Sequence, residues 1–139
     1  MKLFLLISTL LFSETVKPDT IQNWQIYYGN ELILTGNENG IQSVDKVEIK
    51  ITDEREIKNI DVVFNYDNGL PTKRTFELWL DSTRRKLSAK VGPGNSYVIC
   101  LQCHVDKYFN RQQFEIFYSD NKENRSRRLL GTIVLLKGK

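Results

Sequence analysis

The chain has 139 residues, which allows one domain with its own core and leaves little room for a second. Apolar residues make up 40% of it and charged residues 27%, the composition of a folded globular protein, which excludes wholesale disorder. The net charge of +3 is too balanced for a dedicated nucleic-acid binder, and one histidine with two cysteines is too few for a zinc-finger type of metal site. We therefore expect neither a nucleic-acid partner nor a metal site.

The first fifteen residues have the features of a secretory signal peptide. Lys2 supplies a positive charge, and the apolar stretch Leu3–Phe12 is about half as long as a transmembrane helix requires. The alternative is a buried N-terminal strand or helix. We expect residues 1–15 to be a signal peptide and residues 16–139 to form a single domain. The mature chain is then secreted or periplasmic and has no transmembrane segment.

From Trp24 onward, apolar and polar residues alternate with a period of two, the pattern of half-buried strands. The dipeptide Gly29-Asn30 between the first two strands predicts a two-residue hairpin. Some seven to nine short strands with turns about every 8–12 residues favour an all-β fold, an antiparallel β-sandwich of the immunoglobulin-like kind. The expected strands are Trp24–Tyr28, Leu32–Leu34, Val47–Ile51, Ile60–Tyr66, Phe76–Leu80, Leu87–Val91, Tyr97–Leu101, Phe114–Tyr118 and Leu129–Leu136.

One segment, residues 101–109, departs from the period of two. Its apolar residues recur at helical spacing, which predicts one short helical turn between two late strands. These residues are Leu101, Val105, Tyr108 and Phe109.

Charge is distributed unevenly along the chain. Between Glu14 and Leu70 five basic residues oppose eleven acidic ones, a net −6, whereas between Pro71 and Lys139 fourteen basic residues oppose six acidic ones, a net +8. The simpler interpretation is that early and late strands pair and neutralise each other. The alternative is a basic surface for an anionic partner, built from Arg84, Arg85, Lys86, Arg125, Arg127 and Arg128.

The segment from Cys100 to His104 matches C-x-x-C-H, the attachment pattern of c-type haem. In that pattern two thiols bind the macrocycle and the histidine ligates the iron. His104 is the only histidine, and the only methionine, Met1, lies in the expected signal peptide, so a haem would lack a conventional second axial ligand. We expect no cofactor, with haem c held by Cys100, Cys103 and His104 as the alternative.

The same two cysteines have two further interpretations. A thioredoxin-like redox dithiol requires a βαβ framework, and the strand pattern does not show one. The structural interpretation is that the two cysteines either form a disulfide or pack as small apolar residues. A disulfide between Cys100 and Cys103 fits an oxidising compartment, but it requires a bend, because strand residues three apart face opposite sides.

No familiar catalytic motif is present, so we expect no catalytic residue and no enzymatic activity. Carboxylates gather at Asp53, Glu54 and Glu56, and again at Asp67, where acid–base chemistry or calcium binding competes with an ordinary polar turn. Asn124 begins an N-glycosylation pattern.

Strand parity predicts a second apolar face. If alternate residues of the segment 76–80 face the core, Trp79 points outward, and the same logic places Val63 and Phe117 outward. A covering segment would bury these side chains. The alternative is an exposed patch anchored by Trp79, which binds a protein, a small ligand or a second copy of the chain in a homodimer.

These features together predict an exported, non-enzymatic β-sandwich that acts as a binding or interaction module. The alternative function is a small redox or electron-transfer protein outside the cytoplasm that uses the C-x-x-C-H segment.

Overall fold

A computed structural model describes residues 22–37, 46–65, 73–81, 83–121 and 127–139. The expected signal peptide, Asp67, Arg125 and the Asn124 glycosylation pattern lie outside these ranges. The described strands are β1 (Asn23–Tyr28), β2 (Glu31–Asn37), β3 (Lys46–Ile51), β4 (Ile60–Asn65), β5 (Arg74–Leu80), β6 (Arg85–Gly92), β7 (Ser96–Ile99), β8 (Arg111–Asp120) and β9 (Arg128–Lys137). Two short 3-10 helices, η1 (Glu54–Glu56) and η2 (Leu101–His104), precede β4 and β8.

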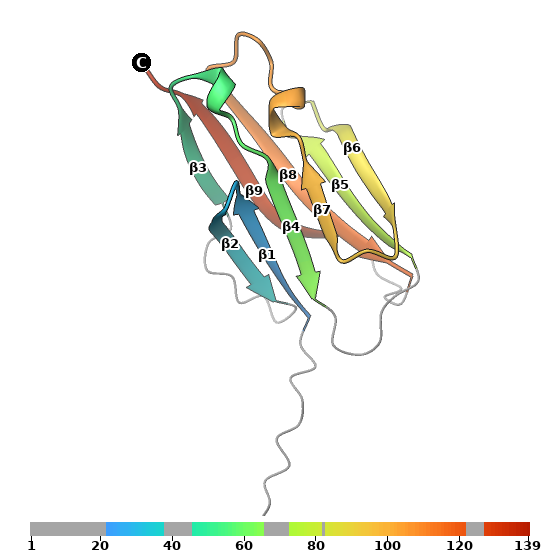
Figure 1. The fold of residues 1–139 in the computed structure, drawn as a ribbon. Coiled ribbons are helices and arrows are strands. Elements are labelled where there is room, and N and C mark those ends of the chain that lie inside the picture. Colours follow the sequence, from blue (N-terminus) through green and yellow to red (C-terminus); the bar gives the residue numbers. More distant parts are fainter. Residues whose placement is uncertain (1–21, 38–45, 66–72, 82, 122–126) are drawn as a thin grey trace, which may run out of the picture.

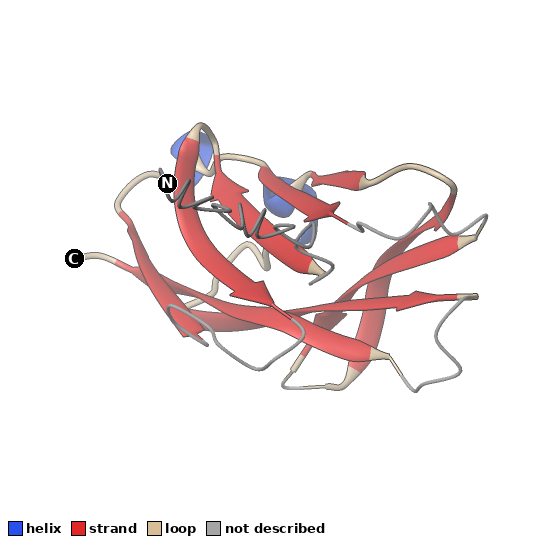
Figure 2. Cartoon of the chain, turned by 90° about the horizontal axis from the view of Figure 1, so that it is seen from below, coloured by secondary structure: helices blue, strands red, loops and turns tan. Residues whose placement is uncertain are grey.

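The strands form two sheets that pack face to face, as the two views of the ribbon show (Figures 1 and 2). Sheet A has the strand order β2-β1-β4-β7, and sheet B has the order β3-β9-β8-β5-β6. The predicted hairpin joins β1 to β2, where Gly29 adopts a φ of 61°, in the left-handed region that favours glycine. The prediction of an all-β sandwich is confirmed.

One strand pair differs from the expected antiparallel arrangement. β3 runs parallel to β9, with Lys46 opposite Thr132 and Ile51 opposite Lys137. β9 pairs with β8 on its other side in the antiparallel sense. The last strand of the sequence therefore lies inside sheet B, between an early strand and a late one.

The core lies between the two sheets and is filled by the inward residues of each strand. In β5, Phe76, Leu78 and Leu80 are buried, as the parity of the sequence predicted. Aromatic rings form the centre of the core, where Phe64 lies stacked between Trp24 and Tyr118 at centroid distances of 5.9 and 3.8 Å. In β5 the alternation that predicted the strand thus also predicted which residues stabilise the fold by burial.

β6 is an edge strand, and most of the apolar residues that predicted it are exposed, unlike the buried residues of the neighbouring strand β5. A register shift between Leu78 and Trp79 of β5 places Ala89 opposite Glu77, on the outer face of sheet B. Ala89 is exposed, and Val91 is 58% exposed. Two of the three apolar residues whose alternation predicted this strand therefore lie outside the core.

The predicted helical turn is present, but it is short. Only η2 has helical backbone in this segment, and Val105 beyond it is already extended. Leu101 and Phe109 are buried, whereas Tyr108 is 81% exposed. The residues at helical spacing thus do not form one continuous helix, and two of them, Leu101 and Phe109, are buried separately in the core. In the described ranges, no helix has the length and apolar character needed to cross a membrane.

Candidate functional site

Trp79 and Phe117 lie together on the outer face of sheet B. They come from the neighbouring strands β5 and β8, where Trp79 lies opposite Glu115 and Phe117 lies opposite Glu77. The two ring centroids are 6.5 Å apart, and the rings are nearly perpendicular at 82°. Both side chains are half-buried. The direct pairing of β5 with β8 holds the two rings in a fixed relative position.

Val63, the third residue of the predicted apolar face, lies elsewhere. It belongs to β4 in sheet A, where it pairs with Gln25 on one side and Ser96 on the other. Its neighbours in sequence, Val62 and Phe64, face the core, so Val63 points to the opposite side of the sandwich from Trp79. The three predicted residues therefore do not form one surface.

Arg127 occupies the angle between the two rings. Its guanidinium carbon lies 4.4 Å from the Trp79 ring centroid and 4.3 Å from that of Phe117. Its Nη1 is 3.6 Å from Oε2 of Glu77, and the indole Nε1 of Trp79 donates a hydrogen bond of 2.6 Å to the same oxygen. We call Trp79, Phe117 and Glu77 the aromatic corner, with Arg127 as its occupant.

The contacts that hold Arg127 in the aromatic corner are individually weak. The side chain of Arg127 is 44% exposed and that of Glu77 is 19% exposed. Ion pairs at such exposure stabilise a fold by up to about 1 kcal/mol, and cation–π contacts at exposed sites contribute about 0.5–1 kcal/mol each. Arg127 therefore covers the rings without being locked onto them.

A small cavity of about 160 Å³ adjoins the aromatic corner. Its charged lining residues are Asp81, Arg84, Glu115 and Arg127. Burial raises the pKa of Glu115, and the charge of Asp81 raises it further, whereas Arg84 and Arg127 lower it. Arg84 and Arg127, from the two predicted basic clusters, thus reach one cavity, but the two carboxylates that also line it give it mixed charge.

The two cysteines are joined by a disulfide with an Sγ–Sγ distance of 2.01 Å. The turn of η2 provides the necessary bend, in which the backbone N–H of Cys103 donates to the carbonyl of Cys100. In this bonded form neither sulfur is available for a thioether bond to haem. The carbonyl of His104 accepts a hydrogen bond from Gln112, and the described segments contain no α-helix that could form a thioredoxin-like framework.

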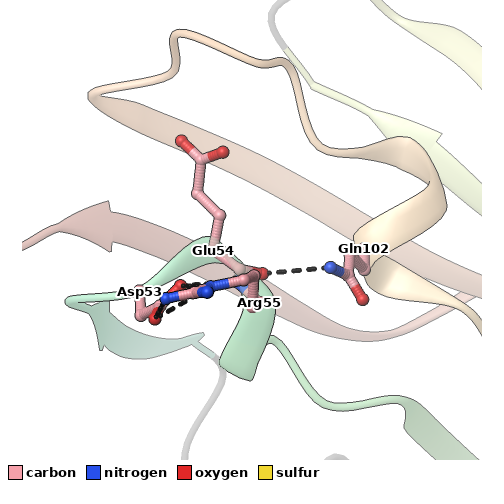
Figure 3. Close-up of polar contacts among 4 residues, drawn as sticks. All are labelled: Asp53, Glu54, Arg55 and Gln102. Atoms are coloured by element: carbon pink, nitrogen blue, oxygen red, sulfur yellow. Dashed lines mark hydrogen bonds and ion pairs between the residues drawn. The ribbon is translucent and has the colours of Figure 1, made fainter.

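The predicted carboxylate cluster supports the turn at η1 (Figure 3). Oδ1 of Asp53 accepts the backbone N–H of Arg55 at 2.9 Å, and Oδ2 pairs with the guanidinium of Arg55 at 2.8 Å. Hydrogen bonds from Arg55 lower the pKa of Asp53. The carbonyl of Glu54 accepts from Gln102, which joins η1 to η2. Among the described residues no group of three or more His, Cys, Asp or Glu is arranged to hold a metal ion.

A larger cavity, about 430 Å³, lies between the end of β1 and the segment from β3 to η1. Tyr28 and Ile49 contribute apolar surface, and Lys50, Glu56 and Lys58 contribute charge. Its volume is in the range of small-ligand sites. No pattern in the sequence indicates this cavity, because its walls come from both sheets and the period within a strand does not report which strands meet.

The aromatic corner thus brings two rings, a carboxylate and the cation of Arg127 together on the outer face of sheet B. No model of a known protein family matches the chain, and comparison with curated proteins finds no relative.

Proposed function

We propose that the chain is a binding module that recognises a protein partner through the outer face of sheet B, centred on Trp79 and Phe117. The observation that carries the proposal is the pair of perpendicular rings on neighbouring strands, with an arginine between them. Leu129, opposite Phe117 on β9, is 41% exposed and extends the apolar surface. Tryptophan and arginine are the residue types that most often dominate the free energy of protein–protein binding.

At the aromatic corner, charge and cavity size favour a protein over a nucleic acid or a small molecule. Nucleic-acid binding needs a continuous basic surface, whereas Asp81 and Glu115 line the same cavity as Arg84 and Arg127 here. The cavity beside the rings, at about 160 Å³, is smaller than the roughly 300 Å³ at which small-molecule sites begin. A protein surface needs no deep cavity, because it is bound by a flat apolar centre with a polar rim.

A displayed library of random peptides, selected on the wild-type protein, tests this function. The bound peptides should lose about tenfold or more in affinity for the Trp79→Ala variant. The matched control is Val98→Ala, which removes an exposed apolar side chain from β7 of the other sheet and should leave binding unchanged. Failure to select any peptide, or equal binding to Trp79→Ala and wild type, would overturn the proposal.

Export is part of the proposal, and the apolar segment Leu3–Phe12 supports it. The intact mass of material recovered outside the cytoplasm should correspond to a chain that begins between about Ser13 and Lys17, within the usual range of signal-peptide lengths. Exported material that still carries Leu3–Phe12 would contradict it.

A second candidate function, thiol–disulfide exchange, is favoured by one observation: both cysteines of the Cys100–Cys103 bridge are exposed. Exchange with two glutathione molecules would give two protein thiols and one glutathione disulfide. Thiol titration in glutathione buffers of graded potential tests this function. A redox protein should titrate within the range of an extracytoplasmic compartment, whereas a structural bridge should remain oxidised there.

A further inference from the structure

The aromatic corner is a rigid receptor for the side chain of Arg127. Its walls belong to β5 and β8, which pair directly, with Glu77 opposite Phe117. The occupant comes from outside these strands, because Arg127 is the residue before β9 begins. The site is therefore formed by two paired strands, whereas the side chain of Arg127 enters it from outside both of them.

The shape and charge of the aromatic corner match a guanidinium group. Two ring faces within 4.4 Å of one carbon suit a planar, delocalised cation, and Glu77 supplies a carboxylate for its N–H groups. Three carboxylates surround the site (Glu77, Asp81 and Glu115), whereas two guanidinium groups balance them (Arg84 and Arg127). The site is therefore built around a cation, and exchange of one guanidinium group for another leaves this balance of charge unchanged.

We propose that the aromatic corner binds an arginine side chain of the protein partner, which takes the place of Arg127. This inference rests on the proposed function and adds the chemistry of the partner to it. Exchange replaces one guanidinium by another, so the contacts with both rings and with Glu77 are remade. Arg127 then moves toward solvent, to which nearly half of its side chain is already exposed.

N-acetyl-argininamide is the probe for this exchange, and the indole N–H resonance of Trp79 is the readout. In the Arg127→Ala variant the probe should shift this resonance saturably, with an affinity at least about tenfold above that of the wild type. The wild type binds more weakly because Arg127 competes as a tethered ligand at high effective concentration. N-acetyl-citrullinamide, a neutral molecule of nearly the same shape, should not bind.

Two further variants keep the test decisive. Arg127→Gln opens the aromatic corner while retaining a polar side chain, and it should behave as Arg127→Ala does. Arg85→Ala, at an exposed arginine of β6, is the matched control and should resemble the wild type. The proposal is overturned if both folded Arg127 variants fail to respond to the arginine probe, or if the citrulline probe binds equally well.

The outcomes also separate this inference from the proposed function. Selected peptides that depend on Trp79, together with an arginine probe that does not bind, would keep the binding function and reject arginine as the recognised group. If the probe binds the Arg127 variants but the selected peptides bind Trp79→Ala as well as the wild type, arginine recognition is kept and peptide binding through Trp79 is rejected.

Discussion

Trp24 donates a hydrogen bond of 2.9 Å from its indole Nε1 to the main-chain carbonyl of Leu130. The bond crosses the core from β1 of sheet A to β9 of sheet B and joins residues 106 positions apart in the sequence. Leu130 lies at a register shift, because Ile116 pairs with Gly131 and Phe117 with Leu129. The shift leaves the Leu130 carbonyl available to the indole, so an irregularity in one sheet fixes the position of a ring from the other.

Trp24→Phe should destabilise the fold by about 2–4 kcal/mol. The change removes the donor, leaves a buried carbonyl without its partner and creates a small cavity. Urea denaturation of the two proteins measures the difference. Trp79→Phe is the matched control, since the same substitution at a half-buried position should cost less than about 1 kcal/mol. Equal costs at the two positions would contradict this account of Trp24.

Gly36→Ala should also be destabilising, by about 1–3 kcal/mol or more. An added Cβ would lie 2.4 Å from Cζ2 of Trp24. The Trp24 residue is only 2% exposed, and its hydrogen bond to the Leu130 carbonyl holds the ring in place. In Gly94→Ala the nearest atom is the flexible end of Lys90 at 3.3 Å, so this control should fold with nearly unchanged stability. Thermal denaturation of the two variants distinguishes the cases. A Gly36→Ala protein as stable as Gly94→Ala would show that the Trp24 ring has room to move.

Trp79→Ala should lower the free energy of unfolding by about 1–2 kcal/mol, less than the roughly 3–5 kcal/mol typical of a fully buried aromatic residue. The side chain is half-buried, and its partners Phe117 and Arg127 are themselves partly exposed. Chemical denaturation provides the measurement. A loss in the larger range would mean that Trp79 is a packing residue, and the binding face centred on it would be rejected.

Replacement of Cys100 and Cys103 by serine should cost about 2 kcal/mol or less, because the bridge closes a loop of only four residues. Peptide binding through Trp79 should be retained, since η2 does not contribute to the cavity beside the aromatic corner. Denaturation and peptide titration of the double variant measure both effects. Loss of activity in a folded double variant would favour the redox function instead.

Glu115 should make stability depend on pH. Because the folded chain raises the pKa of Glu115 above its usual 4.5, folding favours the protonated carboxyl group. That stabilisation is complete below about pH 4.5 and is lost as the pH rises through the raised pKa. Glu115→Gln has no charge to lose, so its melting temperature relative to wild type should rise between acid and neutral pH. Glu48→Gln, at an exposed position of β3, is the control, and parallel profiles for all three proteins would refute the role of Glu115.

Much of the fold could be predicted from the sequence, because alternation within a strand reports burial directly. The parity of β5 placed Phe76 in the core and Trp79 outside, and both placements hold in the structure. Parity does not report which sheet a strand joins, so it grouped Val63 with residues on the far side of the sandwich. It also fails at register shifts, which is why the exposure of Ala89 was not foreseen.

The candidate site was only half predictable, for a related reason. Trp79 and Phe117 lie on β5 and β8, which pair with each other without a register shift, and their period indicated the outer face. Arg127 appeared in the sequence only as one of several basic residues near a turn. Its position between the two rings depends on the backbone just before β9, where no periodic pattern exists. The parallel pairing of β3 with β9 was not predictable either, because the alternation of apolar and polar residues is the same in parallel and antiparallel strands.

The position of β9 inside sheet B has a consequence for the order in which the chain folds. β3 and β8 each pair with β9, and the pairing of Lys46 with Thr132 spans 86 residues, so sheet B is completed only when the last strand docks. Folds dominated by such distant pairings fold slowly, typically in milliseconds to seconds. Until β9 arrives, β3 has no sheet to join and β8 presents an open edge, which other chains could bind. A truncation within β9 should therefore yield aggregates rather than a smaller folded sandwich.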